Sequence, residues 1–219
     1  MTHRVRGLVA FDLDGTLIKG RTVCELIAEP LGRLPRMRSI ERLRSEEHLA
    51  AAREEMATWY RAVPEARLLE CLDDADLASG ATEAVDLLKR SGVECAISSI
   101  TWLFAVERFG QRLGVSHCQG TSIDDDGQIA HVWPRDKGRW VRDLAASLDV
   151  PVARVASVGD SWRDADMFLA SERAFFVGDQ AELPRLPDHV TFVPDGDLVA
   201  IAQSLVREWT SSGTSMREP

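Results

Sequence analysis

The chain has 219 residues, of which 45% are hydrophobic, enough to build the core of one domain or of one domain with a smaller insertion. Its 35 acidic residues outnumber its 26 lysines and arginines, and the resulting net charge of −9 disfavours binding to nucleic acid or to an anionic membrane. The four cysteines lack CxxC spacing, and no apolar run is long enough for a signal peptide or a membrane span, so we expect a cytoplasmic protein with reduced thiols.

The N-terminal part of the chain combines one buried strand with a helical block. The apolar run at 7–11 is typical of a strand buried on both faces of a sheet. It ends in DLDGT (12–16), a turn that carries two acids. From 22 to 72 the pattern is helical and predicts a small all-helical insert. Its breaks are marked by Pro30, Pro35 and Pro64.

Strands and helices alternate beyond the insert, which predicts an α/β fold with a mostly parallel sheet. The expected strands are 93–98, 152–158 and 174–177, with a hairpin in 121–133 around Asp126-Gly127. The expected helices are 80–92, 101–114 (with Thr101 as N-cap and Gly114 as its end), 137–148 and 164–170. A last strand and helix occupy 190–207, and 210–219 is predicted to be a disordered tail.

Polar residues that follow the apolar runs form the candidate site, because ligands of open parallel sheets bind beyond the carboxyl ends of the strands. Lys137, which is expected to open a helix, lies between two of these groups in the sequence. The residues that follow the strands are Asp12, Asp14, Thr16, Ser98, Ser99, Asp160 and Asp164.

Three acids near one point can bind Mg²⁺, which would also coordinate a phosphate oxygen. A lysine and a hydroxyl would complete the phosphate pocket. Asp12 can then attack phosphorus and form an aspartyl phosphate, while Asp14 moves a proton to the leaving oxygen and later from water. Each residue also has a structural interpretation. Asp12 and Asp14 can lie in a solvated turn. Ser98 can be a helix cap and Lys137 a surface charge. Asp160 and Asp164 can be acids in the first turn of a helix that interact favourably with the helix dipole.

The ordered set DLDGT (12–16), AIS (96–98), Lys137 and GDSWRDADM (159–167) resembles the four signatures of the haloacid dehalogenase superfamily, in its phosphoserine-phosphatase-like branch. The resemblance implies a Rossmann-like core and a helical cap that closes over the site. The core would comprise 1–18 and 80–209, and the cap 19–79. It also implies a Mg²⁺-dependent phosphatase that hydrolyses a small soluble phosphomonoester through an aspartyl phosphate.

The resemblance assigns roles to individual positions. Asp12 is expected to be the nucleophile and Asp14 the general acid and base; Ser98 would bind the phosphoryl oxygens and Lys137 would offset charge. Thr16 and Ser99 are expected to contact the substrate. The metal would be held by Asp12, the backbone carbonyl of Asp14 and Asp160, with Asp164 supporting the metal's waters or Lys137.

The chain departs from the phosphoserine phosphatase pattern at three places. Arg21 stands where those enzymes usually carry a glutamate that contacts the substrate ammonium, Ser99-Ile100 replaces Gly-Gly, and Arg163 replaces Asn. A cation beside the site prefers an anionic leaving group, so Arg21 and Arg163 are predicted to contact a carboxylate or second phosphate. The alternative is two solvated arginines at helix starts. The five arginines within 33–44 are interpreted as a solvated helix face, and Trp162 is expected near the site.

Other functions remain compatible with the same residues. A phosphotransferase or mutase would use the same aspartyl phosphate with an acceptor other than water. A phosphorylation-dependent binding protein is disfavoured, because a response-regulator receiver carries its phospho-accepting acid where this chain has Ser98. The absence of GxxxxGK[ST] excludes a P-loop kinase. A small phosphate ester is the expected partner, without nucleic acid or membrane, and the protein is expected to be a monomer or homodimer.

Overall fold

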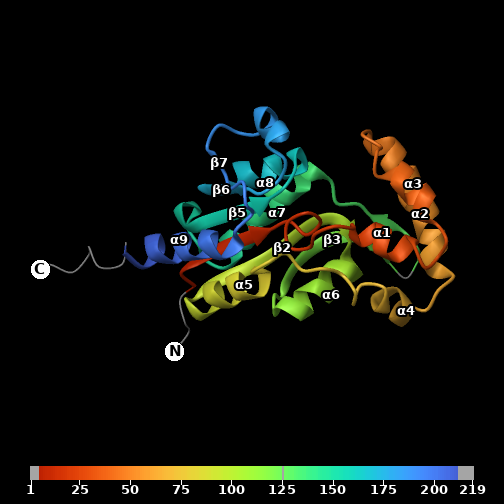
Figure 1. The fold of residues 1–219 in the computed structure, drawn as a ribbon, viewed down its shortest axis with the longest axis horizontal. Helices are drawn as coiled ribbons and strands as arrows, with labels where there is room; N and C mark the ends of the chain where they lie inside the picture. Colours follow the sequence, from red (N-terminus) through yellow and green to blue (C-terminus); the bar gives the residue numbers. More distant parts are fainter. Residues whose placement is uncertain (1–4, 125, 212–219) are drawn as a thin grey trace, which may run out of the picture.

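A mostly parallel sheet forms the centre of the protein in a computed structural model that describes residues 5–124 and 126–211 (Figure 1). Within these residues the sheet has seven strands in the order β4-β3-β2-β1-β5-β6-β7, and all neighbours are parallel except β3 and β4. The strands are β1 (Gly7–Phe11), β2 (Val93–Trp102), β3 (His117–Ile123), β4 (Ile129–Ala130), β5 (Val155–Gly159), β6 (Arg173–Phe176) and β7 (Val190–Phe192). The predicted α/β fold with a mostly parallel sheet is confirmed.

The helices divide into an insert after β1 and layers on both faces of the sheet. The insert contains α1 (Val23–Ala28), α2 (Leu34–Ile40), α3 (Glu46–Arg61) and α4 (Glu65–Glu70). The sheet is flanked by α5 (Ala81–Arg90), α6 (Leu103–Leu113), α7 (Pro134–Ser147), α8 (Ala165–Leu169) and α9 (Leu198–Ser211). Short 3₁₀ turns are η1 (Val152–Arg154), η2 (Trp162–Asp164) and η3 (Gln180–Arg185).

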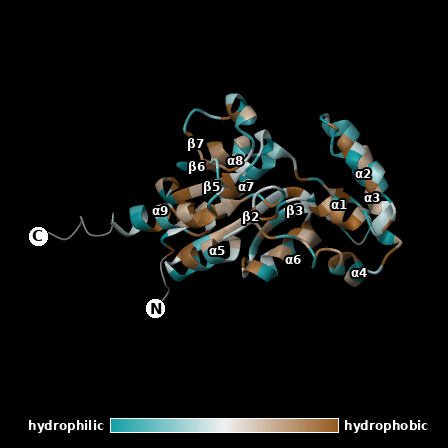
Figure 2. Cartoon of the chain, in the orientation of Figure 1, coloured by the Kyte–Doolittle hydropathy of each residue, from teal (hydrophilic) through white to brown (hydrophobic). Residues whose placement is uncertain are grey.

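Alternating side chains of β1 explain why helices cover both faces of the sheet. Val9 and Phe11 pack into the apolar cluster that includes residues of α5, α6 and α9, whereas Leu8 and Ala10 pack into the cluster with α7 and α8. Successive residues of a strand point to opposite faces, so a strand with no polar residue needs an apolar layer on each side. Figure 2 shows this hydrophobic centre and the more hydrophilic outer surfaces of the helices.

The helical insert packs against the sheet at the end of β2. Its buried side chains belong to the same cluster as Trp102 and Phe109 of the sheet layer, and Tyr60 contacts Trp102 edge to face with ring centroids 5.5 Å apart. Arg53 of α3 is buried and donates to the carbonyl oxygens of Ile100 at 2.6 Å and Val132 at 3.0 Å. These contacts fix the insert beside the carboxyl ends of the strands.

Three predicted boundaries differ from the structure. Thr101 is not a helix N-cap, because β2 continues through Trp102, whose buried side chain extends the packed strand, and α6 begins at Leu103. Lys137 does not open its helix; α7 begins at Pro134, where Asp136 accepts from the backbone N–H of Trp133 at 2.9 Å. The strand expected from 152 begins at Val155, after η1.

The chain end differs from the prediction as well. Thr210 and Ser211, assigned to a disordered tail, form the last turn of α9, where their hydroxyls donate to carbonyls of the preceding turn. The rest of the predicted tail, 212–219, lies outside the described residues. Among the described helices, none combines the length and the hydrophobicity that crossing a bilayer requires.

Candidate active site

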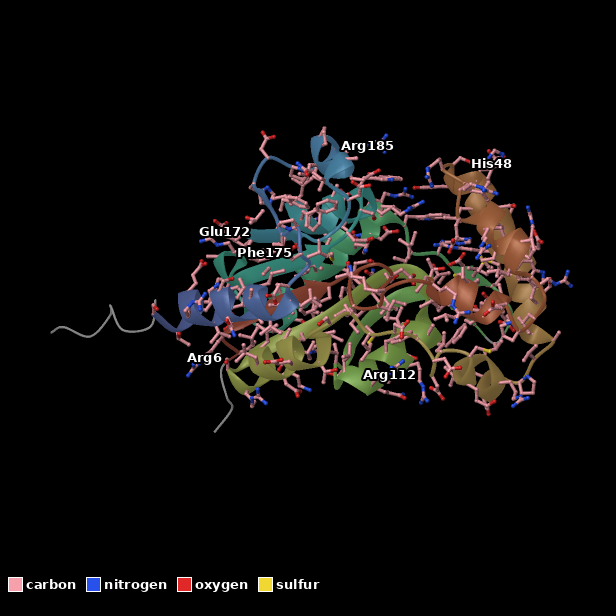
Figure 3. All side chains as sticks on the ribbon, viewed as in Figure 1. Arg6, His48, Arg112, Glu172, Phe175 and Arg185 are labelled. Carbon is pink, nitrogen blue, oxygen red and sulfur yellow. The ribbon has the colours of Figure 1, made fainter. Side chains whose placement is uncertain are left out.

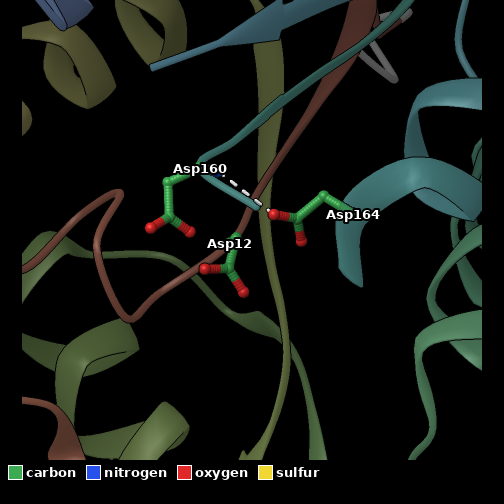
Figure 4. A group of neighbouring side chains, drawn as sticks. All are labelled: Asp12, Asp160 and Asp164. Atoms are coloured by element: carbon green, nitrogen blue, oxygen red, sulfur yellow. Dashed lines mark hydrogen bonds between the residues drawn. The ribbon is translucent and has the colours of Figure 1, made fainter. Parts of the chain in front are cut away.

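The strand order places the predicted acids side by side. Since β1 lies between β2 and β5, with Phe11 in register with Ile97 on one side and Val158 on the other, the residues that follow these strands meet at one edge. One carboxylate oxygen from each of Asp12, Asp160 and Asp164 lies within 4.8 Å of the others. Figure 4 shows the three carboxylates grouped there, with Asp12 between the other two.

Asp164 organises the turn after β5. Its Oδ2 accepts from the backbone N–H groups of Asp160 and Ser161, both at 3.1 Å, and so fixes the direction in which the chain leaves the strand. Its Oδ1 accepts from the ammonium of Lys137. Because both carboxylate oxygens already have partners, the geometry favours the supporting role predicted for Asp164.

Lys137 is a buried cation between two of the acids. Its side chain is 1% exposed, and its Nζ donates to Oδ1 of Asp12 at 2.7 Å and to Asp164. Burial alone lowers the pKa of an ammonium, but the two carboxylates outweigh it and raise the pKa of Lys137. The lysine is therefore held charged beside Asp12.

The acids outnumber the cation that pairs with them. Burial raises the pKa of Asp12, partly opposed by Lys137, and burial together with the charges of Asp12 and Asp164 raises the pKa of Asp160. Three ionised carboxylates beside one ammonium leave net negative charge in this group. A hard divalent cation with oxygen ligands would balance it, so the residues present fit the expected Mg²⁺.

Asp14 is not part of the three-carboxylate group. Its Oδ1 accepts from the backbone N–H of Val23 at 2.7 Å, at the N-terminus of α1 that the hydroxyl of Thr22 caps. Burial raises the pKa of Asp14 to about 7, with the Val23 hydrogen bond opposing it and the charge of Asp12 adding to it. Both protonation states are then accessible near neutral pH, as a general acid and base requires.

The predicted hydroxyl residues differ in what they contact. The buried Ser98 donates to Oε1 of Gln119 at 2.6 Å, and Ser99 accepts from the backbone N–H of Thr101 at 3.3 Å. The Oγ1 of Thr16 is buried and has no hydrogen-bond partner among the described residues. Gln119 was missed by sequence reasoning, because its place opposite Ser98 follows from the pairing of β2 with β3 and from no local motif.

Gly15 lets the turn after β1 approach Asp160. Its φ is +85°, and a Cβ there would lie 2.0 Å from Oδ2 of Asp160. The Gly15→Ala substitution should therefore displace this carboxylate and weaken Mg²⁺ binding about 10- to 100-fold, measured by calorimetry. Gly32→Ala is the matched control, since Gly32 has a φ of +66° and open space at the Cβ position. Equal Mg²⁺ affinities in the two variants would contradict the expected displacement.

The two predicted substrate arginines lie in different surroundings. Arg21 pairs with Glu29 and lines a cavity of about 480 Å³ formed by α1 and α4 residues such as Leu26 and Leu68. Arg163 lies in η2 between Asp160 and Asp164, with its guanidinium 5.2 Å from the ring centre of Trp162. The structure thus brings Arg163 to the acids, and Arg21 contacts Glu29 instead.

The family model of haloacid dehalogenase-like hydrolases matches residues 9–169. Over 180 residues, 78% of this chain, the sequence is 24% identical to phosphoserine phosphatase SerB2 of Mycobacterium tuberculosis, covering 44% of that protein. It is 34% identical over 193 residues to a phosphoglycolate phosphatase of Pyrobaculum aerophilum, covering 78% of this chain and 82% of that one. The chain spans less than half the length of the curated phosphoserine phosphatases that it matches.

The fold is similar to solved phosphatase structures. A substrate-bound phosphoserine phosphatase complex superimposes with a TM-score of 0.74 and 19% identity, covering 90% of this chain and 97% of that chain. This similarity concerns the arrangement of the sheet, its helices and the insert.

Proposed function

The chain belongs to the haloacid dehalogenase-like hydrolase family, and from this we propose that it is a Mg²⁺-dependent phosphatase of a small phosphomonoester. One observation carries the proposal. Asp12, paired with the buried Lys137, lies beside Asp160, while the neighbouring Asp14 accepts a hydrogen bond from the N-terminus of α1. This separates a nucleophile from a proton-transfer group within one short turn.

The metal would be held by the carboxylates of Asp12 and Asp160 and by the backbone carbonyl of Asp14. Asp164 would support the site by accepting from Lys137 and from the backbone N–H groups of the turn after β5. When bound, Mg²⁺ supplies positive charge that neutralises the phosphoryl oxygens. Lys137 contributes a second, permanent positive charge beside Asp12. Ser98 and Thr16 offer hydroxyls, one already oriented by Gln119 and the other without a partner among the described residues.

The proposed reaction has two steps. A carboxylate oxygen of Asp12 forms a bond to phosphorus while the bond from phosphorus to the ester oxygen breaks, and the carboxyl of Asp14 gives its proton to that leaving oxygen. In the second step the carboxylate of Asp14 takes a proton from a water molecule that attacks the aspartyl phosphate, which releases inorganic phosphate and restores Asp12. The pKa of about 7 for Asp14 suits both transfers.

The insert at 19–79 is proposed to be a cap over this site. Support comes from the hydrogen bond between Val23 of α1 and Asp14, and from the contacts of Arg53 with Ile100 and Val132. A cap would exclude water while Asp12 attacks the ester. Relatives named for phosphoserine and phosphoglycolate support a small substrate, and both of those molecules carry a carboxylate near the phosphate ester.

Inorganic phosphate release from a panel of small phosphate esters tests the proposal. We expect release that requires Mg²⁺, stops on chelation and returns when Mg²⁺ is added back. Phosphate appearing only on an added acceptor would replace hydrolysis by phosphotransfer. No reaction of any ester, with or without acceptor, would instead leave a phosphate-dependent binding protein as the better explanation.

A further inference from the structure

A cavity of about 330 Å³ lies between the insert and the sheet layer. Residues 43–46 and 49 of the insert form one side. The other sides are provided by residues near the end of β2, at the start of α7, in η2 and at the start of α8. Figure 3 labels His48, which marks the end of α3 at which this cavity lies. The lining residues used below are Arg44, Ile100, Trp133, Trp162 and Arg163.

Two residues that line the cavity lie close in the chain to the reacting groups. Ile100 follows the phosphate-binding candidate Ser98 by two residues in β2, and Arg163 lies between Asp160 and Asp164 in the chain. The charges of Asp164, Asp12 and Asp160 act on Arg163 and oppose the lowering of its pKa by burial. A phosphoester with its phosphorus at Asp12 would therefore have this cavity within reach of its leaving group.

Two guanidinium groups at this cavity have no ion pair with a carboxylate in the part of the chain that the structure describes. Arg44 donates to the backbone carbonyls of Glu41 at 3.2 Å and Leu43 at 3.4 Å, and Arg163 stacks on Trp162. Neither forms an ion pair with a carboxylate of the described residues. Burial, and then the charge of Arg44, lower the pKa of Arg163, so the two cations disfavour one another.

Another arginine at the cavity does have a carboxylate partner. Arg135, also at the cavity, forms an ion pair with Glu46. Glu41 acts electrostatically on Arg163, but its carboxylate accepts from the hydroxyl of Thr22, and burial raises its pKa. Glu46 and Asp166 also line the cavity, but among the described residues neither forms an ion pair with Arg44 or Arg163. An anion bound in the cavity would supply this direct partner.

We propose that this cavity binds the leaving group of the phosphoester and that Arg44 and Arg163 bind a second anionic group on it, a carboxylate or a phosphate. The inference rests on the proposed function and names its substrate class. The rings of Trp133 and Trp162, with Ile100, then contact the carbon skeleton between the two anions. Arg44, which the sequence assigned to a solvated helix face, is a specificity residue in this proposal.

Matched substrates test the proposal, because 3-phosphoglycerate and glycerol 3-phosphate differ mainly in a carboxylate against an alcohol. Arg44→Gln and Arg163→Gln should each reduce kcat/KM for 3-phosphoglycerate about 10- to 100-fold more than for glycerol 3-phosphate, mainly through KM. Propanediol bisphosphate distinguishes a phosphate from a carboxylate as the preferred anion. Phosphoserine has an ammonium in place of the 2-hydroxyl of 3-phosphoglycerate. A preference for phosphoserine would overturn a site that recognises only the anionic groups of its substrate.

Two controls separate the cavity from general charge effects. Arg36→Gln removes an exposed insert arginine that pairs with Glu55 and should leave the ratio of the two kcat/KM values unchanged. Arg21→Glu tests the other predicted arginine, which pairs with Glu29. Equal losses for both substrates in Arg44→Gln and Arg163→Gln, or a ratio that changes only in Arg21→Glu, would overturn the proposal.

Binding measurements keep this inference separate from the proposed function. Calorimetry with the Asp12→Asn variant measures the affinity for 3-phosphoglycerate whether or not the ester is hydrolysed. If adding Arg44→Gln weakens this binding while the native chain hydrolyses no ester, the result would support the proposed cavity and contradict the proposed phosphatase activity. Binding that does not change on adding Arg44→Gln would contradict the cavity even if the phosphatase is confirmed.

Discussion

Asp12→Asn is expected to reduce phosphate release by at least about 10⁴-fold, because the amide cannot form the acyl phosphate that the proposed first step requires. Asparagine keeps the size of the side chain and an acceptor oxygen for Lys137, whose Nζ lies 2.7 Å from Oδ1 of Asp12. The loss should therefore appear in turnover while the fold persists. Acid-quenched protein from a reacting mixture should contain phosphoenzyme in the native chain and none in the variant.

Asp143→Asn is the matched control for this substitution. Asp143 is exposed on α7, the helix that carries Lys137, so the variant makes the same chemical change away from the acids. It should retain turnover within about twofold, as expected for surface substitutions. Phosphoenzyme formation by Asp12→Asn, or turnover within tenfold of the native chain, would show that Asp12 is not the nucleophile.

Lys137→Met is expected to lower the free energy of unfolding by about 3–5 kcal/mol, measured by urea denaturation without Mg²⁺. The reason is that Asp12 and Asp164 would keep their burial and lose the ammonium that both now accept from. Phosphate release should also fall, because the variant lacks the permanent positive charge beside the nucleophile. The methionine fills similar space, so a cavity does not explain the loss.

A double variant identifies the cause of that destabilisation. Adding Asp164→Asn to Lys137→Met removes one of the two unpaired carboxylates and should recover part of the lost stability, which a double-mutant cycle measures. Lys89→Met is the control, since Lys89 is exposed and donates to the carbonyl of Gly114; it should cost less than about 1.5 kcal/mol. Additive effects of the first two substitutions would contradict a charge origin.

The sequence by itself determined the class of fold and the chemistry that the site can hold. Local patterns mark where strands end, and the acids at 12, 14, 160 and 164 stand directly after two such ends. Parallel strands bring their carboxyl ends to one edge, so the meeting of Asp12, Asp160 and Asp164 could be expected without coordinates. The pairing of Lys137 with Asp12 and Asp164 agrees with the charge-offsetting role that the resemblance assigned to this lysine.

Only the tertiary structure decided which groups accompany the acids. Gln119 reaches Ser98 through the register of β2 and β3, and Val23 reaches Asp14 through the entry of the chain into the insert. Arg44 and Arg163 share a cavity, whereas Arg21 pairs with Glu29. The first contact depends on strand register, and the shared cavity depends on how the insert docks against the sheet. Such contacts arise from packing and charge balance over the whole molecule, and no periodicity or short motif encodes them.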